Sequence, residues 1–203
     1  MLRDLTARLA YPHYRVLVGV YSNDPATAAA VMAVGDPRIA LARCGRPGPT
    51  TKADCLNHLW RAVLADELVA DRQFKAVVLH DAEDVVHARD LAVFDNLLPR
   101  LAMVQLPVAP LVGSGSRWIS GHYLDEFAEA HAKDLAVREA LGAAVPSTGV
   151  ACAIARDMIG RLAGTGGEPF DAGSMTEDDE LGIRIKALGG RGALDGRCNF
   201  WPC

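Results

Sequence analysis

Three acidic residues directly follow a short apolar run near the middle of the chain. Val77–Leu79 has the composition of a buried strand, and Asp81, Glu83 and Asp84 come immediately after it. Carboxylates at alternate positions point to one side of an extended chain, and such oxygen ligands suit Mg²⁺ or Mn²⁺ shared with substrate phosphates. Ligands of α/β sheets bind at the carboxyl ends of the strands. We therefore favour a ligand site over the alternative, a solvated loop in which Asp84 caps the next turn.

A lysine stands at the start of a predicted helix in the segment 48–52, Gly-Pro-Thr-Thr-Lys. Lys52 opposes the helix dipole there unless an anion lies nearby. Helix-end amides, two hydroxyls and an ammonium group could together bind a diphosphate. The spacing is not that of a P-loop. An ordinary exposed lysine explains the segment equally well, so the residues alone leave both readings open.

A second acidic segment, residues 174–180, opens another predicted helix. Thr176 with Asp179, or Ser174 with Glu177, has the spacing of a capping box, which is a purely structural explanation. Four successive acids nevertheless exceed what a cap needs. Repulsion among them could raise the pKa of one carboxyl group toward the value that suits a general base.

The elements that must position these residues alternate along the chain. Asp24 is expected to cap one helix, with Pro25 at its first position, and Gly189–Gly190 to end the last helix. Alternating strands and helices predict one domain, residues 1–203, of three-layer α/β/α architecture with a mostly parallel sheet. The predicted strands are 16–21, 39–42, 77–79, 103–106 and 150–155, and the predicted helices are 2–9, 25–34, 51–68, 91–98, 118–141, 157–162 and 176–188.

Composition narrows the class of protein. A chain of 203 residues that is half apolar and carries a formal charge of −4 is typical of a soluble globular domain. Without a cluster of basic residues, we expect no nucleic-acid partner. The longest mainly apolar segment, 101–113, is shorter than the ~20 residues of a transmembrane helix. Five cysteines without a Cys-x-x-Cys pair favour a reducing, cytoplasmic location.

The motifs together resemble those of family 2 glycosyltransferases of the GT-A fold. The resemblance rests on Asp81-x-Glu83, on Lys52 within Thr-Lys-Ala-Asp-Cys-Leu-Asn, and on Thr-Glu-Asp at 176–178 followed by Leu181-Gly182. It covers about residues 11–194. The phrases at 20–25, 79–84 and 125–129 are similar to the membrane-anchored, cellulose-synthase-like branch, which includes the bacteriophage adsorption protein B group.

This resemblance implies inverting, metal-dependent transfer from a nucleotide-diphospho-sugar, most simply a UDP-sugar, to a glycan or lipid-linked acceptor. Asp81 and Glu83 correspond to the Asp-x-Asp positions that bind Mg²⁺ or Mn²⁺, and Asp178 corresponds to the general base. The resemblance also implies that Asp24 and Asp81 contact the nucleotide and that Lys52 contacts the diphosphate. Thr148, Gly149 and Glu177 would contact the sugar, the acceptor or other substrate groups.

Two family features are expected but not found in the sequence. Family members begin with a strand ahead of the first helix, and processive relatives carry a Gln-x-x-Arg-Trp motif after the Thr-Glu-Asp helix. We therefore expect a chain truncated at both ends, whose sheet lacks the first family strand and which reaches the inner face of the cytoplasmic membrane only peripherally. A non-catalytic nucleotide-binding or membrane-partner module is one alternative. A metal-dependent phosphohydrolase is another, although no nucleophile motif accompanies the acids.

Overall fold

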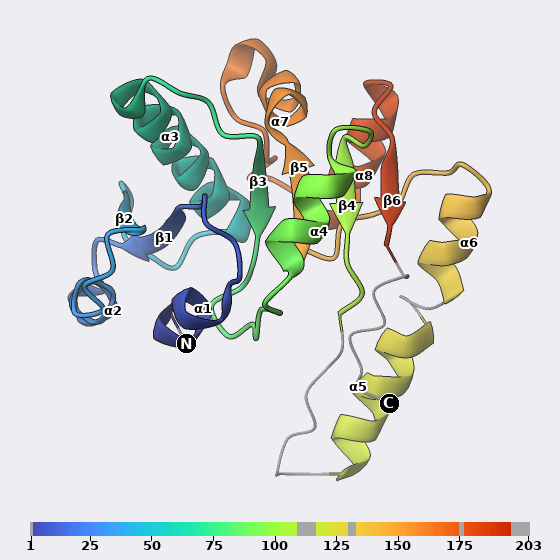
Figure 1. The fold of residues 1–203 in the computed structure, drawn as a ribbon, viewed down its shortest axis with the longest axis horizontal. Helices are drawn as coiled ribbons and strands as arrows, with labels where there is room; N and C mark the ends of the chain where they lie inside the picture. Colours follow the sequence, from blue (N-terminus) through green and yellow to red (C-terminus); the bar gives the residue numbers. More distant parts are fainter. Residues whose placement is uncertain (1, 109–116, 130–132, 175–176, 196–203) are drawn as a thin grey trace.

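The strands of this computed structural model, which describes residues 2–108, 117–129, 133–174 and 177–195, form two sheets (Figure 1). The first is a parallel pair of β1 (Val16–Tyr21) and β2 (Ile39–Cys44). The second has four strands in the order β3 (Ala76–Leu79), β5 (Cys152–Ala155), β4 (Met103–Gln105) and β6 (Gly192–Leu194). The predicted single sheet is thus divided between β1 and β3.

Two of the four neighbouring strand pairs in the described residues are parallel, β1 with β2 and β4 with β6, and the two pairs that include β5 are antiparallel. Strands β3, β4 and β6 run the same way, because β5 is antiparallel to both β3 and β4 while β6 is parallel to β4. The reversal of β5 was not predicted. Strand β6 was also missed, since three residues that begin with a glycine carry too short a pattern to reveal a strand.

The helices follow the predicted order along the chain. The segment predicted as one helix at 118–141 contains α5 and α6; residues 130–132 lie outside the described residues, and residues 133–134 are π-helical directly before α6. Helix α6 packs against β6. Leu135 of this helix is only 5% exposed, and the Glu139 carboxylate accepts the backbone N–H of Leu194 at 3.1 Å. The helices are α1 (Leu2–Arg8), α2 (Pro25–Met32), α3 (Lys52–Ala70), α4 (Asp90–Leu97), α5 (Arg117–Glu129), α6 (Leu135–Ala140), α7 (Arg156–Ala163) and α8 (Glu177–Ala187), and the 3₁₀ turn η2 (Gly164–Gly166) follows α7.

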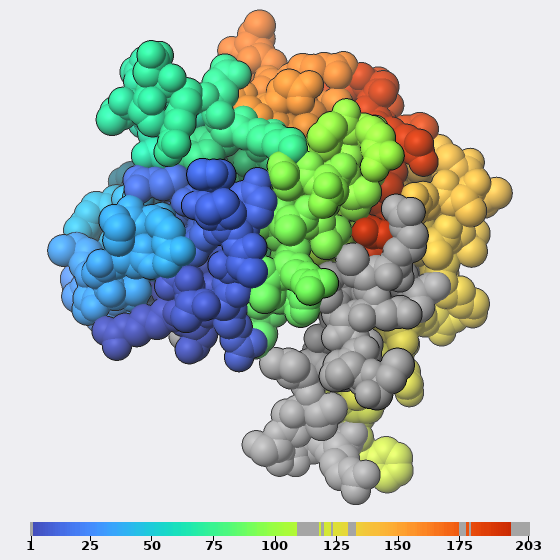
Figure 2. Space-filling view, in the orientation of Figure 1, coloured from blue at the N-terminus to red at the C-terminus, as the bar shows by residue number. Residues whose placement is uncertain are grey.

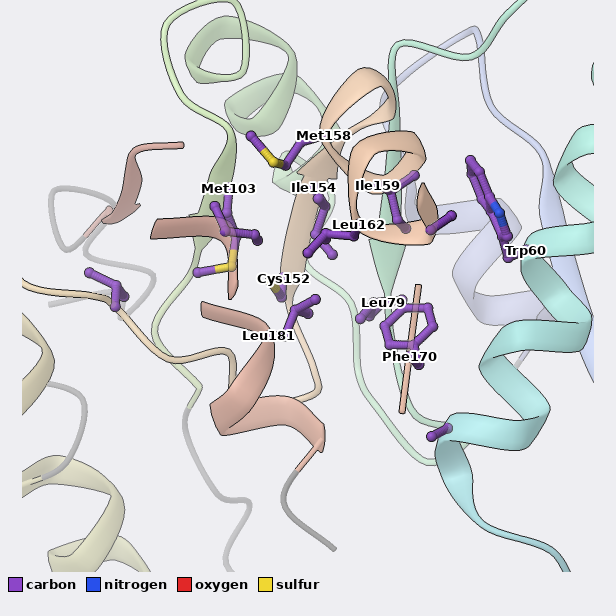
Figure 3. Packing of buried hydrophobic residues seen from close by; sticks show 14 of the residues in the cluster. Trp60, Leu79, Met103, Cys152, Ile154, Met158, Ile159, Leu162, Phe170 and Leu181 are labelled. Atoms are coloured by element: carbon purple, nitrogen blue, oxygen red, sulfur yellow. The ribbon is translucent and has the colours of Figure 1, made fainter. Parts of the chain in front are cut away.

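Helices cover both faces of the four-stranded sheet, which confirms the three-layer α/β/α architecture. Met103 and Ile154 pack on one face against α7 and α8 (Figure 3). Val104 and Ala153, one position along in each strand, face the other way and pack against Phe94 of α4. This alternation follows from the two-residue period of a strand. The hydrophobic core therefore fixes which strand residues face each helical layer.

Local sequence signals set the first residues of the two helices next to the candidate site, α2 and α3. The Asp24 carboxylate accepts the backbone N–H of Thr27 at 3.0 Å and begins α2, as predicted. The Thr51 hydroxyl accepts the N–H of Asp54 at 3.2 Å, so that α3 begins at Lys52. These caps are a frequent way to satisfy the free amides of a first helical turn.

Helix α3 connects the two sheets through side chains. It packs on β1 and β2, while Asn57 exchanges hydrogen bonds of 2.8 and 3.0 Å with the backbone of Phe170. Near its other end, Glu67 forms an ion pair of 2.8 Å with Arg156, whose guanidinium lies 4.5 Å from the centre of the Trp60 ring. Within the described ranges, no backbone ladder joins β1 to β3.

A cavity of about 290 Å³ lies where β1 and β3 are separated. Its walls are mainly apolar and come from both helical layers as well as from the two strands, including Leu17, Leu56, Val77 and Phe94. In the space-filling view, the N-terminal segment lies directly against the segment that contains α4 (Figure 2). The backbone N–H of Ala10 donates to the Ala88 carbonyl at 2.9 Å where these segments meet.

Candidate active site

Lys52 lies at the centre of the candidate site and connects three segments that are distant in sequence. Its Nζ lies 3.0 Å from Asp81 Oδ1 and 3.7 Å from Asp178 Oδ2. The same ammonium donates a hydrogen bond of 3.3 Å to the Gly149 carbonyl. Lys52 begins α3, Asp81 follows β3 and Asp178 lies in the first turn of α8. The structure thus brings four of the predicted site residues together.

Gly149 leaves the space in which Lys52 and Asp178 meet. Its φ of +75° belongs to the left-handed region that favours glycine. A Cβ atom at this position would lie 2.2 Å from Asp178 Oδ2 and 2.7 Å from Lys52 Nζ. The positive φ therefore favours glycine here, and any larger residue would push the Asp178 and Lys52 side chains aside.

The loop that carries Gly149 is held by a glutamine that the sequence reading missed. Gln105, at the end of β4, is fully buried and accepts the backbone N–H of Thr148 at 3.1 Å. Its amide donates to the Val150 carbonyl at 2.9 Å. The Thr148 hydroxyl donates to the same carbonyl at 3.2 Å, so this predicted substrate-binding group is engaged within its own loop. The signal available in the sequence was the single amide side chain of Gln105 in an otherwise apolar strand.

The acids after β3 divide into two kinds. Asp84 closes a turn, because its carboxylate accepts the Asp81 N–H at 2.9 Å and lies 3.3 Å from His80 Nδ1. Burial tends to raise the pKa of Asp84, but the hydrogen bonds from His80 and Asp81 outweigh it and hold that pKa below its ordinary value. Asp81 is part of the Lys52 cluster, and Glu83 is exposed on the same turn. Asp84 thus has the structural role considered in the sequence reading, while Asp81 pairs with Lys52 and Glu83 is exposed.

Two further predicted residues are not part of the Lys52 cluster in what the structure describes. Asp24 caps α2, and hydrogen bonds from Thr27, first from its hydroxyl and then from its backbone, hold the pKa of Asp24 below its ordinary value. Glu177 begins α8, but its side chain lies outside the described residues, as does the whole of Thr176. Their predicted substrate contacts remain predictions.

An asparagine beside Asp24 joins the loops that follow β1 and β2. The Asn23 amide donates to the Gly48 carbonyl at 2.9 Å, and its oxygen accepts the Gly48 N–H at 2.8 Å. Tyr21 and Thr50 share a hydroxyl hydrogen bond of 3.0 Å beside this pair. Through these contacts the turn that holds Asp24 is tied to the segment that leads into Lys52. The Asn-Asp-Pro turn was visible in the sequence, but its partner loop was not.

A three-layer α/β/α domain with an acid–lysine–acid cluster beyond the ends of its strands has the architecture of the GT-A class of transferases. The model of the family described as glycosyltransferase like family 2 matches residues 1–194, and the chain belongs to this family.

Two curated proteins are similar to this chain: bacteriophage adsorption protein B of Escherichia coli K12 and bacteriophage N4 adsorption protein B of Escherichia coli O157:H7. Each is 41% identical over 184 residues, which are 89% of this chain and 25% of the relative. The chain therefore spans about a quarter of the length of these relatives. In the ranges described above, no helix combines the length and apolarity needed to cross a membrane.

Proposed function

We propose that this domain transfers a sugar, with inversion, from a nucleotide-diphospho-sugar to an acceptor hydroxyl, with the help of a divalent cation. The observation that carries the proposal is the position of Lys52, between Asp81 of one motif and Asp178 of another. Three segments separated by many residues meet at one ammonium group. Family membership supports the same class of reaction.

The donor side of the proposed site consists of Lys52, Asp81 and Glu83. Among the described residues, no group of three or more histidine, cysteine or acidic side chains could hold a metal ion. Two carboxylates nevertheless fit Mg²⁺ or Mn²⁺, which commonly takes its other ligands from substrate phosphates and water. A bound cation would neutralise the charge that develops on the leaving diphosphate. Lys52 would contribute to the same stabilisation from the start of α3.

On the acceptor side, Asp178 would act as the general base. It would take the proton from an acceptor hydroxyl whose oxygen forms the new bond to the anomeric carbon, while the bond from that carbon to the diphosphate oxygen breaks. A single displacement of this kind inverts the anomeric centre. Thr148 and Gly149 would line the sugar pocket, Glu177 would contact substrate, and Asp24 would contact the nucleotide. We propose a UDP-sugar as donor and a glycan or lipid-linked molecule at the inner membrane face as acceptor.

Nucleotide binding tests the donor side. We expect UDP to bind with Mn²⁺ or Mg²⁺ present and to lose affinity by roughly tenfold or more, about 1.4 kcal/mol, in Asp81→Asn. Isothermal titration calorimetry measures both values. Asp95→Asn is the matched control, because Asp95 also pairs with a lysine, Lys75, but lies on α4. Binding that needs no metal and ignores Asp81→Asn would contradict the proposal.

Sugar release tests the acceptor side. We expect Asp178→Asn to bind UDP with Mn²⁺ nearly as the unmodified chain does, but to lose sugar transfer or donor hydrolysis by about 10²–10⁴-fold, the usual contribution of a general base. Chromatographic detection of the UDP released from UDP-sugars measures the rate of transfer or hydrolysis. Intact nucleotide binding without any turnover, unaffected by Asp178→Asn, would instead favour the non-catalytic nucleotide-binding module.

A further inference from the structure

We propose that Lys52 is an internal counter-ion that keeps a divalent cation out of the empty site until a diphosphate draws its ammonium away. This inference rests on the proposed function and concerns the order in which that site is filled. It assigns to Lys52 two alternating sets of partners. Without the nucleotide these partners would be carboxylates, and with it they would be phosphate oxygens.

The contacts of Lys52 indicate what an approaching cation would have to displace. Lys52 Nζ lies against Asp81 Oδ1 at 3.0 Å, the same carboxylate that the proposed cation needs. The side chains of Lys52 and Asp81 are only 33% and 39% exposed, so solvent screens the pair less than it would a fully exposed one. A cation that approached Asp81 would meet an ammonium already in place. It must either displace that ammonium or bind beside a like charge.

The neighbouring acids offer the cation no easy alternative. Asp84 is engaged with the Asp81 N–H and with His80. Glu83 is exposed on the turn and by itself is a single carboxylate. Since Mg²⁺ and Mn²⁺ bind through several oxygen ligands, Glu83 alone would hold them weakly. These contacts therefore leave few free carboxylate oxygens for a cation that arrives without the nucleotide.

A diphosphate changes this balance because of where Lys52 stands. Lys52 is the first residue of α3, a position at which the helix dipole disfavours a positive charge and favours an anion. In the structure Asp81 and Asp178 compensate that charge from outside the helix. A diphosphate at the start of α3 would take over this role. Its arrival would release Asp81 for the cation and Asp178 for the acceptor hydroxyl.

The consequence is positive coupling between nucleotide and cation. Because binding free energies are linked reciprocally, a nucleotide that frees Asp81 raises the affinity for the cation, and the cation raises the affinity for the nucleotide by the same factor. The base Asp178 is likewise held 3.7 Å from the ammonium until the donor is bound. Before the donor binds, the proposed metal ligand Asp81 and the proposed base Asp178 are thus both paired with Lys52.

Direct measurement of Mn²⁺ binding tests the counter-ion role without any need for turnover. The free Mn²⁺ signal in electron paramagnetic resonance gives the affinity of the domain in the absence of nucleotide. We expect Lys52→Met to bind Mn²⁺ about tenfold more tightly than the unmodified chain, as loss of one nearby like charge predicts. The same variant should bind UDP more weakly in the presence of Mn²⁺. Opposite changes in the two affinities are the signature of a shared ammonium.

Two variants make the result specific. Lys75→Met removes a lysine that pairs with Asp95 on the surface, and it should change neither affinity. Lys52→Gln keeps hydrogen-bonding capacity but not the charge, and it should change Mn²⁺ affinity in the same direction as Lys52→Met. Melting curves of each variant establish that it is folded, and Lys52→Gln serves as the test if Lys52→Met does not fold.

Failure of this inference is distinguishable from failure of the proposed function. If the unmodified chain binds UDP with Mn²⁺, but the Lys52 variants bind free Mn²⁺ no better or more weakly, then the counter-ion role is wrong and the proposed function stands. If the unmodified chain does not bind UDP at all with Mn²⁺ or Mg²⁺, the proposed function itself is contradicted.

Discussion

Gly149 is the residue at which the candidate site is most sensitive to a small change. A single added methyl group would meet both the Asp178 carboxylate and the Lys52 ammonium. The added group would also force a side chain into a left-handed backbone conformation. A substitution here therefore acts on the site and on the backbone at once, and the two effects need to be separated.

We predict that Gly149→Ala weakens UDP binding by about tenfold and lowers the free energy of unfolding by ~1–3 kcal/mol. Gly35→Ala is the control, because Gly35 has a similar φ of +71° but no atom lies within 4 Å of the added Cβ. It should show the backbone cost alone, with unchanged binding. Calorimetry with UDP and denaturant unfolding measure the two effects. Equal loss of binding in both variants would contradict the steric explanation.

At the residue scale, motif spacing predicted the acids and the lysine but not the groups that hold them. The resemblance to family 2 glycosyltransferases singled out Asp81, Lys52 and Asp178 together, whereas the residues of the Lys52 segment alone left two readings open. Gln105 acts only through its proximity to the 148–150 loop, which depends on how β4 and β5 pair. Such a role requires knowledge of which segments are neighbours in space, and a single sequence does not supply it.

At the scale of elements, helix α8 is positioned by close contact with the backbone of the segment that precedes the Gly149 loop. A Cβ atom on Gly182 would lie 2.1 Å from the Val145 carbonyl oxygen and 2.8 Å from Pro146 Cα. Backbone atoms cannot move aside as a flexible side chain can. Gly182 therefore sets how closely α8, and with it Asp178, approaches Gly149.

We predict that Gly182→Ala destabilises the domain by ~1–3 kcal/mol, because overpacking against a backbone cannot be relieved locally. Gly121→Ala provides the contrast, since Gly121 lies within α5 and its added Cβ meets nothing within 4 Å. That change should stabilise by ~0.5–1 kcal/mol through helix propensity. Thermal unfolding followed by circular dichroism measures both. A Gly182→Ala variant as stable as the original chain would show that α8 can shift outward.

The elements themselves were predictable to the extent that local signals define them. Asp24 with Pro25 marked the start of α2 correctly because a cap is a local interaction, whereas the helix at 51–68 was predicted from its apolar spacing and the Thr51 cap is seen in the structure. The helix predicted at 118–141 corresponds to α5 and α6, and residues 130–132 between them lie outside the described residues; the contact of Glu139 with the backbone of β6 could not be read from apolar spacing. The reversed direction of β5 likewise depends on tertiary pairing that periodicity does not encode.

At the scale of the whole molecule, Glu67 and Arg156 form the principal buried ion pair between α3 and α7. Two Arg156 nitrogens donate to the Glu67 carboxylate, and the backbone N–H of Phe74 donates to it at 2.9 Å. Hydrogen bonding from Arg156 is the main reason that the pKa of Glu67 lies below its ordinary value of 4.5, and it outweighs the opposing effect of burial. The folded state consequently releases this proton more readily than the unfolded chain does.

We predict that Glu67→Gln lowers the free energy of unfolding by ~3–5 kcal/mol near pH 7, as expected when a buried pair loses one charge. The stabilisation from the ionised Glu67 is present above pH 4.5 and is lost as the pH falls through the lowered folded pKa. The free energy of unfolding of the variant should therefore fall less steeply as the pH is lowered through the acidic range. Urea unfolding at a series of pH values measures this.

Glu168→Gln is the comparison for this test, because Glu168 pairs with Arg61 and the two side chains are about half exposed, at 48% and 51%. Its loss should cost no more than ~1 kcal/mol, the value of an exposed pair. If both variants lose the same small amount, the Glu67 pair does not hold α3 against α7.

The separation of β1 from β3 has a mechanical consequence. Two sheets that share a hydrogen-bonded ladder move as one body. Here α3 makes many of the contacts between the two sheets, through the side chains of Asn57, Glu67 and Lys52. Side chains can slide by small steps where backbone ladders cannot, which is the behaviour of a shear motion. Sliding of α3 along its axis would move Lys52 relative to Asp81. Such a shear of α3 would change the distance between Lys52 and Asp81 without the swing of a hinged lid.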